Sequence, residues 1–390
     1  MSLRTVFVTS HPIQYQAPVF RELAKRSELD FQVWFCHLPD ARQQGDGFGV
    51  EFAWDLPLRS GYESHVLKNV AAHPSVTEFR GCDTPEIEQR LRDGKFDCVI
   101  VNGWVVKSCV QTIRACRKLK IPCLVRGEAN LLRPRAWWKR FLHRRWQRQY
   151  TGFLTIGRAN AEFYRQHGAR DEQFFPAPYC VDNDRFAAAA VADPQLGEKF
   201  RQKYGIAPDV VTYLFCAKFI EKKHPLELLQ AFQQAKSQGM HAHLVMVGDG
   251  EIKPACAQFA EQHQLPVIFT GFLNQGDIAA AYFGTDCLVL PSDHGETWGL
   301  VTNEAMACAR PAIVSDQVGC AEDLINANTG AVFPFGRWDL LADRLLEFSR
   351  DLAKLQTMGE AAQQLIANYS PKVAADGITR AVMWSQTTRR

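Results

Sequence analysis

The sequence predicts an α/β protein of two domains, each built on a parallel β-sheet with helices wound around it. The chain has 390 residues, which is too many for one ordinary hydrophobic core and natural for two domains. Short apolar runs rich in β-branched residues alternate with amphipathic segments of helical length, as in sheets joined by right-handed crossovers. A small-residue stretch at 186–197, which contains Pro194, lies between the two series and is the candidate linker.

Ten strands are expected, five in each half of the chain. They lie at 5–9, 31–36, 96–101, 123–126 and 153–156, and then at 211–216, 244–247, 267–269, 287–290 and 312–315. Helix punctuation supports this alternation. Pro225 stands at a first helical position and Gly239 closes the same helix.

Composition is that of an ordinary globular protein, with 46% hydrophobic and 22% charged residues. A net charge of +3 is small for this length and argues against wholesale nucleic-acid binding. The twelve cysteines form no C-x-x-C pair and no zinc-site spacing, so we interpret them as buried residues in a reducing compartment. There is neither a signal-peptide h-region nor an apolar run of membrane-spanning length. We therefore expect a cytoplasmic protein.

The stretch 291–311, PSDHGETWGLVTNEAMACARP, carries the most specific signal. It follows an apolar strand and leads into a helix expected at 300–309. Glu296 lies in the loop before this helix, while Glu304 lies one turn inside it. A strand, a loop and a helix N-terminus present backbone N–H groups to a phosphate. The two carboxylates accept hydrogen bonds from hydroxyls, so the stretch predicts a polyol held above a diphosphate.

This stretch resembles the E-x7-E segment of the retaining glycosyltransferases of family 4. The resemblance implies the GT-B fold, in which two Rossmann-like parallel-sheet domains face a central cleft. It implies that Glu296 contacts hydroxyls of the transferred sugar and Glu304 the ribose diol. Backbone amides around three consecutive residues would hold sugar and phosphate: Trp298, Gly299 and Leu300. Ala309 departs from the pattern, because the family usually has glycine there.

The resemblance is specific over about 211–331 and looser over 1–187. It implies an acceptor-binding domain at 1–187 and a nucleotide-sugar donor-binding domain at 195–370. The segment 371–390 would be a C-terminal helix that crosses back to the first domain.

Two lysines follow the first strand of the second half, Lys218 at the strand end and Lys223 before the next helix. Both can face the crevice at the carboxyl edge of the sheet. In the family this stretch usually reads G-R-x-x-x-x-K-G and binds the donor diphosphate. Lys218 then replaces arginine and loses bidentate geometry, and His224 replaces glycine. Cations here stabilise the departing diphosphate without a metal, so we expect no cofactor besides a UDP- or GDP-sugar substrate.

Two further motifs would indicate a dinucleotide or a metal ion, but both are weaker signals than the stretch 291–311. Gly248-Asp249-Gly250 follows a strand but lacks the third glycine of a dinucleotide fingerprint. In the family, a GDG at this point lines the nucleotide side of the cleft. We expect Phe272 and Leu273 to lie on the same side and to bind the donor. Asp182-Asn183-Asp184 is the one D-x-D. It resembles the family's N-x-V-D loop, so we assign Asp182 to structure and expect no metal site.

The first half offers acceptor-side candidates. The first strand ends in a loop that carries His11, Gln14 and Tyr15, where the family often has a Gly-rich loop. Arg126 and Glu128 follow a later strand, where relatives often carry a polar residue beside the reacting sugar. A local ion pair fits these two equally well. Glu128 is a catalytic candidate but not an assigned nucleophile, because a front-face displacement needs no paired carboxylates.

Residues 129–161 contain eight Lys/Arg and no acidic residue. Their centre, 133–149, interleaves tryptophan and phenylalanine with arginine and lysine, which is typical of helices that lie on anionic membrane surfaces. A surface helix whose tryptophans pack on the domain fits as well. Nothing else in the chain supports a nucleic-acid face. If a membrane is bound, the protein is peripheral on the inner face of the cytoplasmic membrane.

We expect a glycosyltransferase that moves a hexose-type sugar from a nucleoside-diphosphate sugar to a glycan or lipid-linked acceptor. The anomeric configuration would be retained, in cell-surface polysaccharide or glycolipid synthesis. Two other classes stay open: a GT-B-fold sugar-nucleotide epimerase or hydrolase, and a catalytically silent, membrane-associated binding protein.

Overall fold

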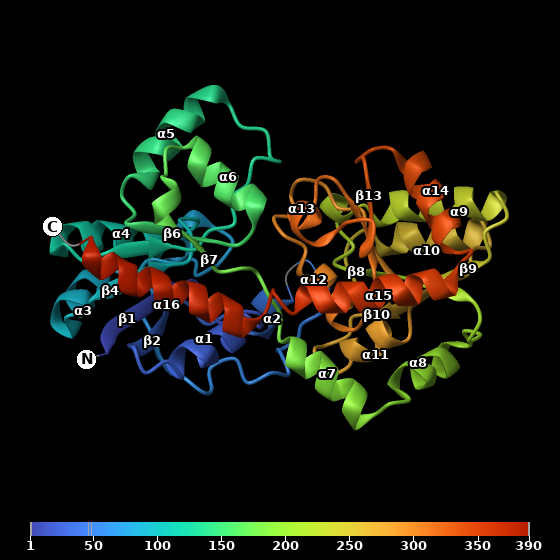
Figure 1. Ribbon diagram of the computed structural model, residues 1–390, viewed down its shortest axis with the longest axis horizontal. Coiled ribbons are helices and arrows are strands. Elements are labelled where there is room, and N and C mark those ends of the chain that lie inside the picture. Colours follow the sequence, from blue (N-terminus) through green and yellow to red (C-terminus); the bar gives the residue numbers. More distant parts are fainter. Residues whose placement is uncertain (1, 46, 48, 389–390) are drawn as a thin grey trace. The chain divides into compact units, whose positions relative to one another are not determined.

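A computed structural model describes residues 2–45, 47 and 49–388 and divides the chain into two compact units (Figure 1). Unit 1 runs up to Gln43, from Pro57 to Cys180, and from Ser370 onward. Unit 2 consists of Gln44–Leu56 and Val181–Tyr369. The chain therefore passes between the units more than once.

Unit 1 has a seven-stranded sheet, parallel throughout, in the order β3-β2-β1-β4-β5-β6-β7. Its strands are β1 (Leu3–Thr9), β2 (Leu29–Phe35), β3 (Glu63–Val66), β4 (Cys98–Val101), β5 (Cys123–Val125), β6 (Gly152–Thr155) and β7 (Phe174–Pro176). Its helices are α1 (Ala17–Ala24), α3 (Ile87–Gly94), α4 (Lys107–Leu119), α5 (Trp137–Gln147), α6 (Arg158–Gln166) and α16 (Pro371–Thr387), with short turns η1 (Phe79–Gly81) and η2 (Asp171–Gln173). The short α2 (Ala41–Gln44) ends where the chain enters unit 2.

Helices cover both faces of this sheet, and each face has its own core. One core joins β1, β2 and β4 to α1 and α16, through apolar side chains such as Phe20 and Ile378. The other joins the opposite strand faces to α3, α4 and α6, through side chains such as Ile113 and Phe163. Helix α16 packs against α1 and β7, so the C-terminal segment completes the first core.

Unit 2 has a six-stranded parallel sheet in the order β10-β9-β8-β11-β12-β13. Its strands are β8 (Val211–Cys216), β9 (Ala242–Val247), β10 (Val267–Gly271), β11 (Cys287–Leu290), β12 (Ala312–Ser315) and β13 (Gly330–Phe333). Its helices are α7 (Asn183–Ala192), α8 (Leu196–Tyr204), α9 (Pro225–Ser237), α10 (Lys253–Gln262), α11 (Ile278–Phe283), α12 (Leu300–Ala307), α13 (Ala321–Leu324), α14 (Trp338–Phe348) and α15 (Leu352–Ile366), with the turn η3 (Glu221–Lys223). Its core joins the sheet to α9, α10 and α14.

The ten expected strands are confirmed, with ends that differ by at most two residues. The described part of the chain also contains β3, β7 and β13, which the apolar pattern did not predict. All three are edge strands of three or four residues. An edge strand is buried on fewer sides and needs fewer apolar residues, so its sequence lacks the signal that marked the central strands.

The stretch expected to be a linker is mostly helical. Asp182 caps the N-terminus of α7, where its side chain accepts a hydrogen bond from the Arg185 amide at 3.2 Å. The structural role assigned to Asp182 is therefore observed. Helix α7 continues to Ala192, and α8 begins four residues later.

Helix α12 ends at Ala307, two residues earlier than expected. The cause is Ala309, whose φ of +56° lies in the left-handed region that the family usually gives to glycine. The next amide, of Arg310, donates to the Ala305 carbonyl at 2.9 Å and closes the helix end. A left-handed alanine costs about 1 kcal/mol relative to glycine, and the closing hydrogen bond offsets part of it.

Candidate functional site

Unit 2 collects four loops at one edge of its sheet, because the carboxyl ends of parallel strands lie together. These loops follow β8, β9, β10 and β11, and backbone hydrogen bonds join them. The Phe219 amide donates to the Asp249 carbonyl at 2.8 Å, and the Asp293 amide donates to the Lys222 carbonyl at 3.0 Å. Nearly all donor-side candidates lie on these loops or on the helix that follows β11.

Lys223 and Glu296 form an ion pair between the loops after β8 and β11. Their side chains are only 14% and 15% exposed. Sequence spacing put both residues at this edge but did not predict that they touch. A pair this poorly solvated retains its attraction but also carries a desolvation cost.

Burial, together with the nearby charges of Lys222 and Lys218, lowers the pKa of Lys223 to about 7. The carboxylate of Glu296 favours the protonated form. The charge of Lys223 is therefore poised to respond to an anion placed beside it. Lys218 lies at the strand end, as expected, with its ammonium group close to the backbone of Gly47.

His224 stands where the family usually has glycine, and its φ of +50° explains that preference. Its ring meets two carboxylates: Nδ1 lies 3.0 Å from Glu227 Oε1, and Nε2 lies 3.8 Å from Asp293 Oδ2. Burial alone would lower the pKa of His224, but these carboxylates raise it above the usual value.

Gly248 and Gly250 lie in the loop after β9, and neither can carry a side chain without a collision. A Cβ on Gly248 would lie 2.0 Å from the Ala217 carbonyl oxygen, and one on Gly250 would lie 2.7 Å from that of Phe219. Both have positive φ, +130° and +149°. The G-D-G therefore allows the loop after β9 to pack directly on the loop that carries Lys218.

Gly248→Ala is expected to lower the free energy of unfolding by about 3 kcal/mol or more, because it adds a backbone collision to an unfavourable φ. Urea denaturation measures this. Gly239→Ala is the matched control, since Gly239 also has positive φ, +94°, but an added Cβ meets nothing within 4 Å. In the control, the free energy of unfolding should fall by only about 1–2 kcal/mol. Equal losses in the two variants would contradict the close packing.

The Trp298-Gly299-Leu300 turn opens α12 at the carboxyl edge. Gly299 is the N-cap residue with φ +98°, and Leu300 is the first helical residue. The Trp298 ring is buried, and its Nε1 donates to Asn303 Oδ1 at 2.8 Å. Trp298 can therefore offer a ligand its backbone, while its side chain anchors the turn.

Glu304 is buried inside α12, and the Tyr282 hydroxyl donates to its Oε2 at 2.7 Å. Burial raises the pKa of Glu304, while Tyr282, Arg185 and Gln275 favour its ionised form. The Arg185 guanidinium donates to the backbone and side-chain oxygens of Gln275, both at 2.5 Å. No sequence pattern indicated these three neighbours, which come from α7, α11 and the loop after β10.

Residues 52–55 add a segment of distant sequence to this site. The Phe52 and Phe272 rings contact each other with centroids 4.3 Å apart and planes tilted by 34°. The Ala53 carbonyl accepts from Asn274 Nδ2 at 2.9 Å, and the Asp55 carboxylate accepts from the Gly276 amide at 2.8 Å. Phe272, and with it the half-buried Leu273, thus lies under a segment that no spacing rule connects to it.

In unit 1, three of the acceptor-side candidates gather around Tyr179. The Tyr15 and Tyr179 ring centroids are 5.4 Å apart, and the Arg126 guanidinium lies 4.7 Å from the Tyr179 ring centroid. The Tyr179 hydroxyl donates to Glu128 in a short hydrogen bond. Burial, together with the Glu128 charge, raises the pKa of Tyr179. No sequence pattern marked Tyr179 as a site residue, although it lies beside the D-x-D motif.

His11 lies beside a different group. Its Nδ1 is 2.9 Å from the Ser10 hydroxyl, and burial, with His37 nearby, lowers its pKa to about 4. His11 is therefore neutral near pH 7 and can offer a hydrogen bond but no charge. Gln14 is half-buried in the turn before α1.

Helix α5 exposes most of its aromatic residues. Trp137 is 83% exposed and Phe141 is 70% exposed, and Trp138 and Leu142 are also exposed. Trp146, by contrast, packs against the unit 1 core, and its Nε1 donates to the Tyr150 hydroxyl at 3.1 Å. The interpretation that all the tryptophans pack on the domain is therefore wrong for Trp137 and Trp138.

Within residues 2–45, 47 and 49–388, no group of three His, Cys, Asp or Glu side chains is placed to hold a metal ion. None of the described helices has the length and apolar character needed to cross a membrane.

Comparison with known proteins identifies the second half of the chain. The family model described as "Glycosyl transferases group 1" matches residues 197–365. The GDP-mannose-dependent alpha-(1-6)-phosphatidylinositol dimannoside mannosyltransferase of Mycobacterium tuberculosis is 26% identical over 201 residues, 47% of this chain and 52% of its own length. The N-acetyl-alpha-D-glucosaminyl L-malate synthase of Bacillus anthracis is 27% identical over 170 residues, 43% of this chain and 44% of its own. The chain thus spans about half the length of the curated relatives it matches.

A likeness in fold extends over nearly the whole chain. HepE of Anabaena, solved with UDP and glucose, superposes with a TM-score of 0.71 at 16% identity, covering 98% of this chain and 99% of its own. The expectation of two parallel-sheet α/β domains is confirmed. Residues 197–365 thus match the glycosyl transferases group 1 family, and the chain has the GT-B fold.

Proposed function

We propose that this protein transfers a hexose-type sugar from a nucleoside-diphosphate sugar to a glycan or lipid-linked hydroxyl, with retention of the anomeric configuration. The observation that carries the proposal is the arrangement around the loop after β11. Glu296 pairs there with Lys223, and Glu304 lies buried in the helix that follows. Two carboxylates that can bind a polyol and the ammonium group of Lys223 thus lie at the same edge of the sheet as the N-terminus of α12.

Each residue has a proposed role. Lys223 and Lys218 stabilise the negative charge that grows on the departing diphosphate, and the amides at 298–300 receive its oxygens. Glu296 accepts hydrogen bonds from hydroxyls of the transferred sugar, and Glu304 from the ribose diol. Gly248, Gly250, Phe272 and Leu273 line the nucleotide side. On the acceptor side stand Arg126, Glu128 and Tyr15, with His11 and Gln14.

The reaction follows from these charges. The bond between the anomeric carbon and the diphosphate oxygen breaks, and the acceptor oxygen bonds to the same face of that carbon. The acceptor proton passes to the departing phosphate oxygen. No protein nucleophile is needed, which agrees with Glu128 being engaged by Tyr179.

Related proteins support the donor and acceptor classes. The mycobacterial relative is named as GDP-mannose-dependent, and HepE has been solved with UDP-glucose. Other relatives are named for lipopolysaccharide and capsular polysaccharide synthesis. We therefore propose a UDP- or GDP-sugar as donor and a cell-surface glycan or glycolipid as acceptor.

The test is to incubate the purified protein with UDP-, GDP- and dTDP-sugars and to measure nucleoside diphosphate release, with Glu304→Ala as control. Release from one donor that the control loses would support the proposal, and a glycosylated product separates a transferase from an epimerase or hydrolase. Absence of release, without any nucleotide-induced rise in melting temperature, would instead favour a catalytically silent binding protein.

We propose that the aromatic residues of α5 bind an anionic membrane surface and that the protein finds its acceptor there. Burying Trp137 and Phe141 at a lipid interface removes large apolar surfaces from water. The segment 129–161 carries eight Lys/Arg and no acidic residue, and each basic residue near an anionic surface contributes about 1 kcal/mol. The protein would then be peripheral on the inner face of the cytoplasmic membrane.

Replacing Trp137 and Phe141 together by serine is expected to weaken binding to phosphatidylglycerol vesicles about 10²-fold, at about 1.5 kcal/mol for each side chain. Vesicle sedimentation measures this, and wild-type binding should weaken with salt. Phe79→Ser is the matched control, because Phe79 is 51% exposed in unit 1 but lies outside α5. If wild-type protein ignores the vesicles at low salt, or the control loses as much binding, the membrane role is wrong.

A further inference from the structure

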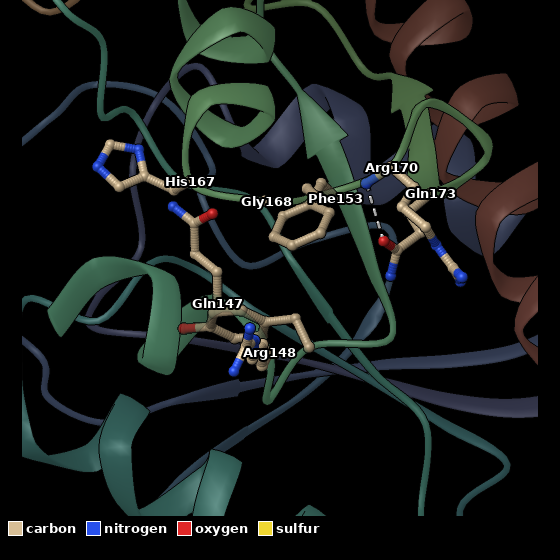
Figure 2. A pocket seen from close by; sticks show the side chains of 9 residues that line it. Gln147, Arg148, Phe153, His167, Gly168, Arg170 and Gln173 are labelled. Atoms are coloured by element: carbon tan, nitrogen blue, oxygen red, sulfur yellow. Dashed lines mark hydrogen bonds between the residues drawn. The ribbon is translucent and has the colours of Figure 1, made fainter. Parts of the chain in front are cut away.

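Unit 1 contains a cavity of about 200 Å³ at the end of α5 (Figure 2). Gln147, Phe153 and His167 are among the residues that line it. Among the residues that the structure describes, the side-chain oxygen and nitrogen of Gln147 and the Nε2 atom of His167 lack hydrogen-bond partners, but these atoms have almost no accessible surface. A molecule in the cavity could not reach them, so they do not define a binding site.

In unit 2, the His224 ring lies between two carboxylates from different elements. Its Nδ1 is 3.0 Å from Glu227 Oε1 on α9, and its Nε2 is 3.8 Å from Asp293 Oδ2 in the loop after β11. The second distance is too long for a hydrogen bond but suits an ion pair with a protonated ring. The side chain of His224 is largely buried. One imidazole ring therefore connects the loop after β11 to α9.

Two aromatic rings fix the orientation of this imidazole. The Phe335 ring lies edge-on to it with centroids 4.9 Å apart, and the Trp338 ring centroid is 5.6 Å away. The backbone of His224 has a φ of +50°, a conformation that glycine adopts more readily. The turn itself therefore does not require a histidine, and a glycine can replace the side chain without opposing the backbone.

Asp293 shapes the turn that presents Glu296. Its Oδ1 accepts a hydrogen bond from the Gly295 amide at 2.6 Å, and its carbonyl accepts one from the Glu296 amide at 2.9 Å. The turn is tight, because a Cβ added to Gly295 would lie 2.8 Å from Asp293 Oδ1. Since Oδ1 is used within the turn, the other carboxylate oxygen faces His224. A movement of Asp293 would therefore move Glu296.

We infer that His224 is a positioning residue for Glu296. Its ring ties the turn 293–296 to α9, and it follows Lys223 directly in the chain. The tie holds the turn where Glu296 pairs with Lys223 and where the Glu296 carboxylate can accept hydrogen bonds from hydroxyls of the transferred sugar. His224 acts through Asp293 and not by contact with the substrate. The inference rests on the proposed function, in which Glu296 binds the sugar and not the nucleotide.

The charges around His224 agree with a protonated ring. Burial lowers the pKa of His224, but the Glu227 and Asp293 carboxylates outweigh this effect and raise the pKa above its usual value. The Phe335 and Trp338 rings packed on it carry no charge. Because the pKa is raised in the folded protein, the tie is complete below the usual histidine pKa of about 6.5 and is lost as pH rises through the raised value.

The tie can be tested without turnover, by following the His224 ring in an NMR pH titration. Asp293→Asn should lower the pKa of His224 by about half a pH unit or more, because it removes one carboxylate charge. Asparagine can still accept from the Gly295 amide and so retain the turn. A pKa that Asp293→Asn leaves unchanged would show that the ring and the turn are not coupled, and would overturn the inference.

His224→Gly should lower turnover about tenfold or more at pH 6, since a small misplacement of a substrate-binding group is costly. Affinity for the nucleoside diphosphate alone should stay unchanged, because that ligand has no sugar for Glu296 to bind. Kinetics and calorimetric titration measure the two quantities. Gln264→Gly is the matched control and should change neither, because Gln264 is an exposed residue of unit 2 with a similar φ of +48°.

A double variant tests whether His224 acts through Asp293. If it does, His224→Gly combined with Asp293→Asn should lose no more turnover than the more damaging single change, whereas independent effects would multiply. Multiplying losses, unchanged turnover in His224→Gly, or an equal loss of nucleoside diphosphate affinity would each overturn the inference. Absence of turnover in the wild-type protein would instead refute the proposed function, and the positioning role with it.

Discussion

Lys223→Ala is expected to lower turnover about 10²–10³-fold with a much smaller change in donor KM. The proposed role of Lys223 is to stabilise charge that develops only as the diphosphate departs, and one preorganised donor of this kind is typically worth that factor. Steady-state kinetics with the donor found by the release assay measures it. Lys222→Ala is the matched control, because Lys222 is an exposed neighbour whose ammonium group lies 3.4 Å from the Gly295 carbonyl oxygen. A comparable loss of turnover in both variants would mean that the overall positive charge of this turn, and not the position of Lys223, supports turnover.

The same residue predicts a pH dependence. With its pKa at about 7, Lys223 is half protonated in the free protein near neutral pH, and a bound diphosphate favours the protonated form. Affinity for the nucleoside diphosphate should therefore fall as pH rises above 7, by up to tenfold per unit, with proton uptake on binding. Lys223→Arg should remove this fall, since arginine stays charged. A flat wild-type profile between pH 6 and 9 would place the diphosphate away from Lys223.

Glu304→Gln is expected to weaken nucleoside diphosphate binding about 10- to 100-fold. Hydrogen bonds between hydroxyls and an ionised carboxylate contribute about 1.5–3 kcal/mol, and the amide loses that charge. The burial that raises the pKa of Glu304 also predicts weaker nucleotide binding as pH falls through that raised pKa. Calorimetric titration measures both effects. Glu261→Gln, on the exposed face of α10, is the control and should change nothing.

The fold should survive Glu304→Gln, because Tyr282 can still donate to the amide oxygen and a buried charge is removed. An unchanged melting temperature with lost affinity would therefore assign Glu304 to the ligand. Unchanged affinity in Glu304→Gln together with unchanged turnover in Lys223→Ala would refute the proposed donor site.

The sequence by itself determined the parallel sheets and the loops that carry the candidate site. Central strands are buried on both faces, so their apolar runs at 211–216 and 287–290 match β8 and β11 residue for residue. The strand–loop–helix order after β11 is encoded locally, so the sequence alone placed Glu296 in the loop and Glu304 in the helix. Pro225 and Gly239 marked the ends of α9 for the same reason, since their backbone preferences act within one turn.

Only the tertiary structure decided which side chains meet. The ion pair of Lys223 with Glu296, and the enclosure of Glu304 by Tyr282 and Arg185, join segments more than 20 residues apart. Which tryptophans of α5 are exposed also depended on the surface the helix rests on, because its sequence allows either arrangement. Burial, pKa shifts and the cavity at Gln147 arise from packing between distant elements. Local sequence patterns encode how a segment folds, whereas these properties depend on what the rest of the chain places beside it.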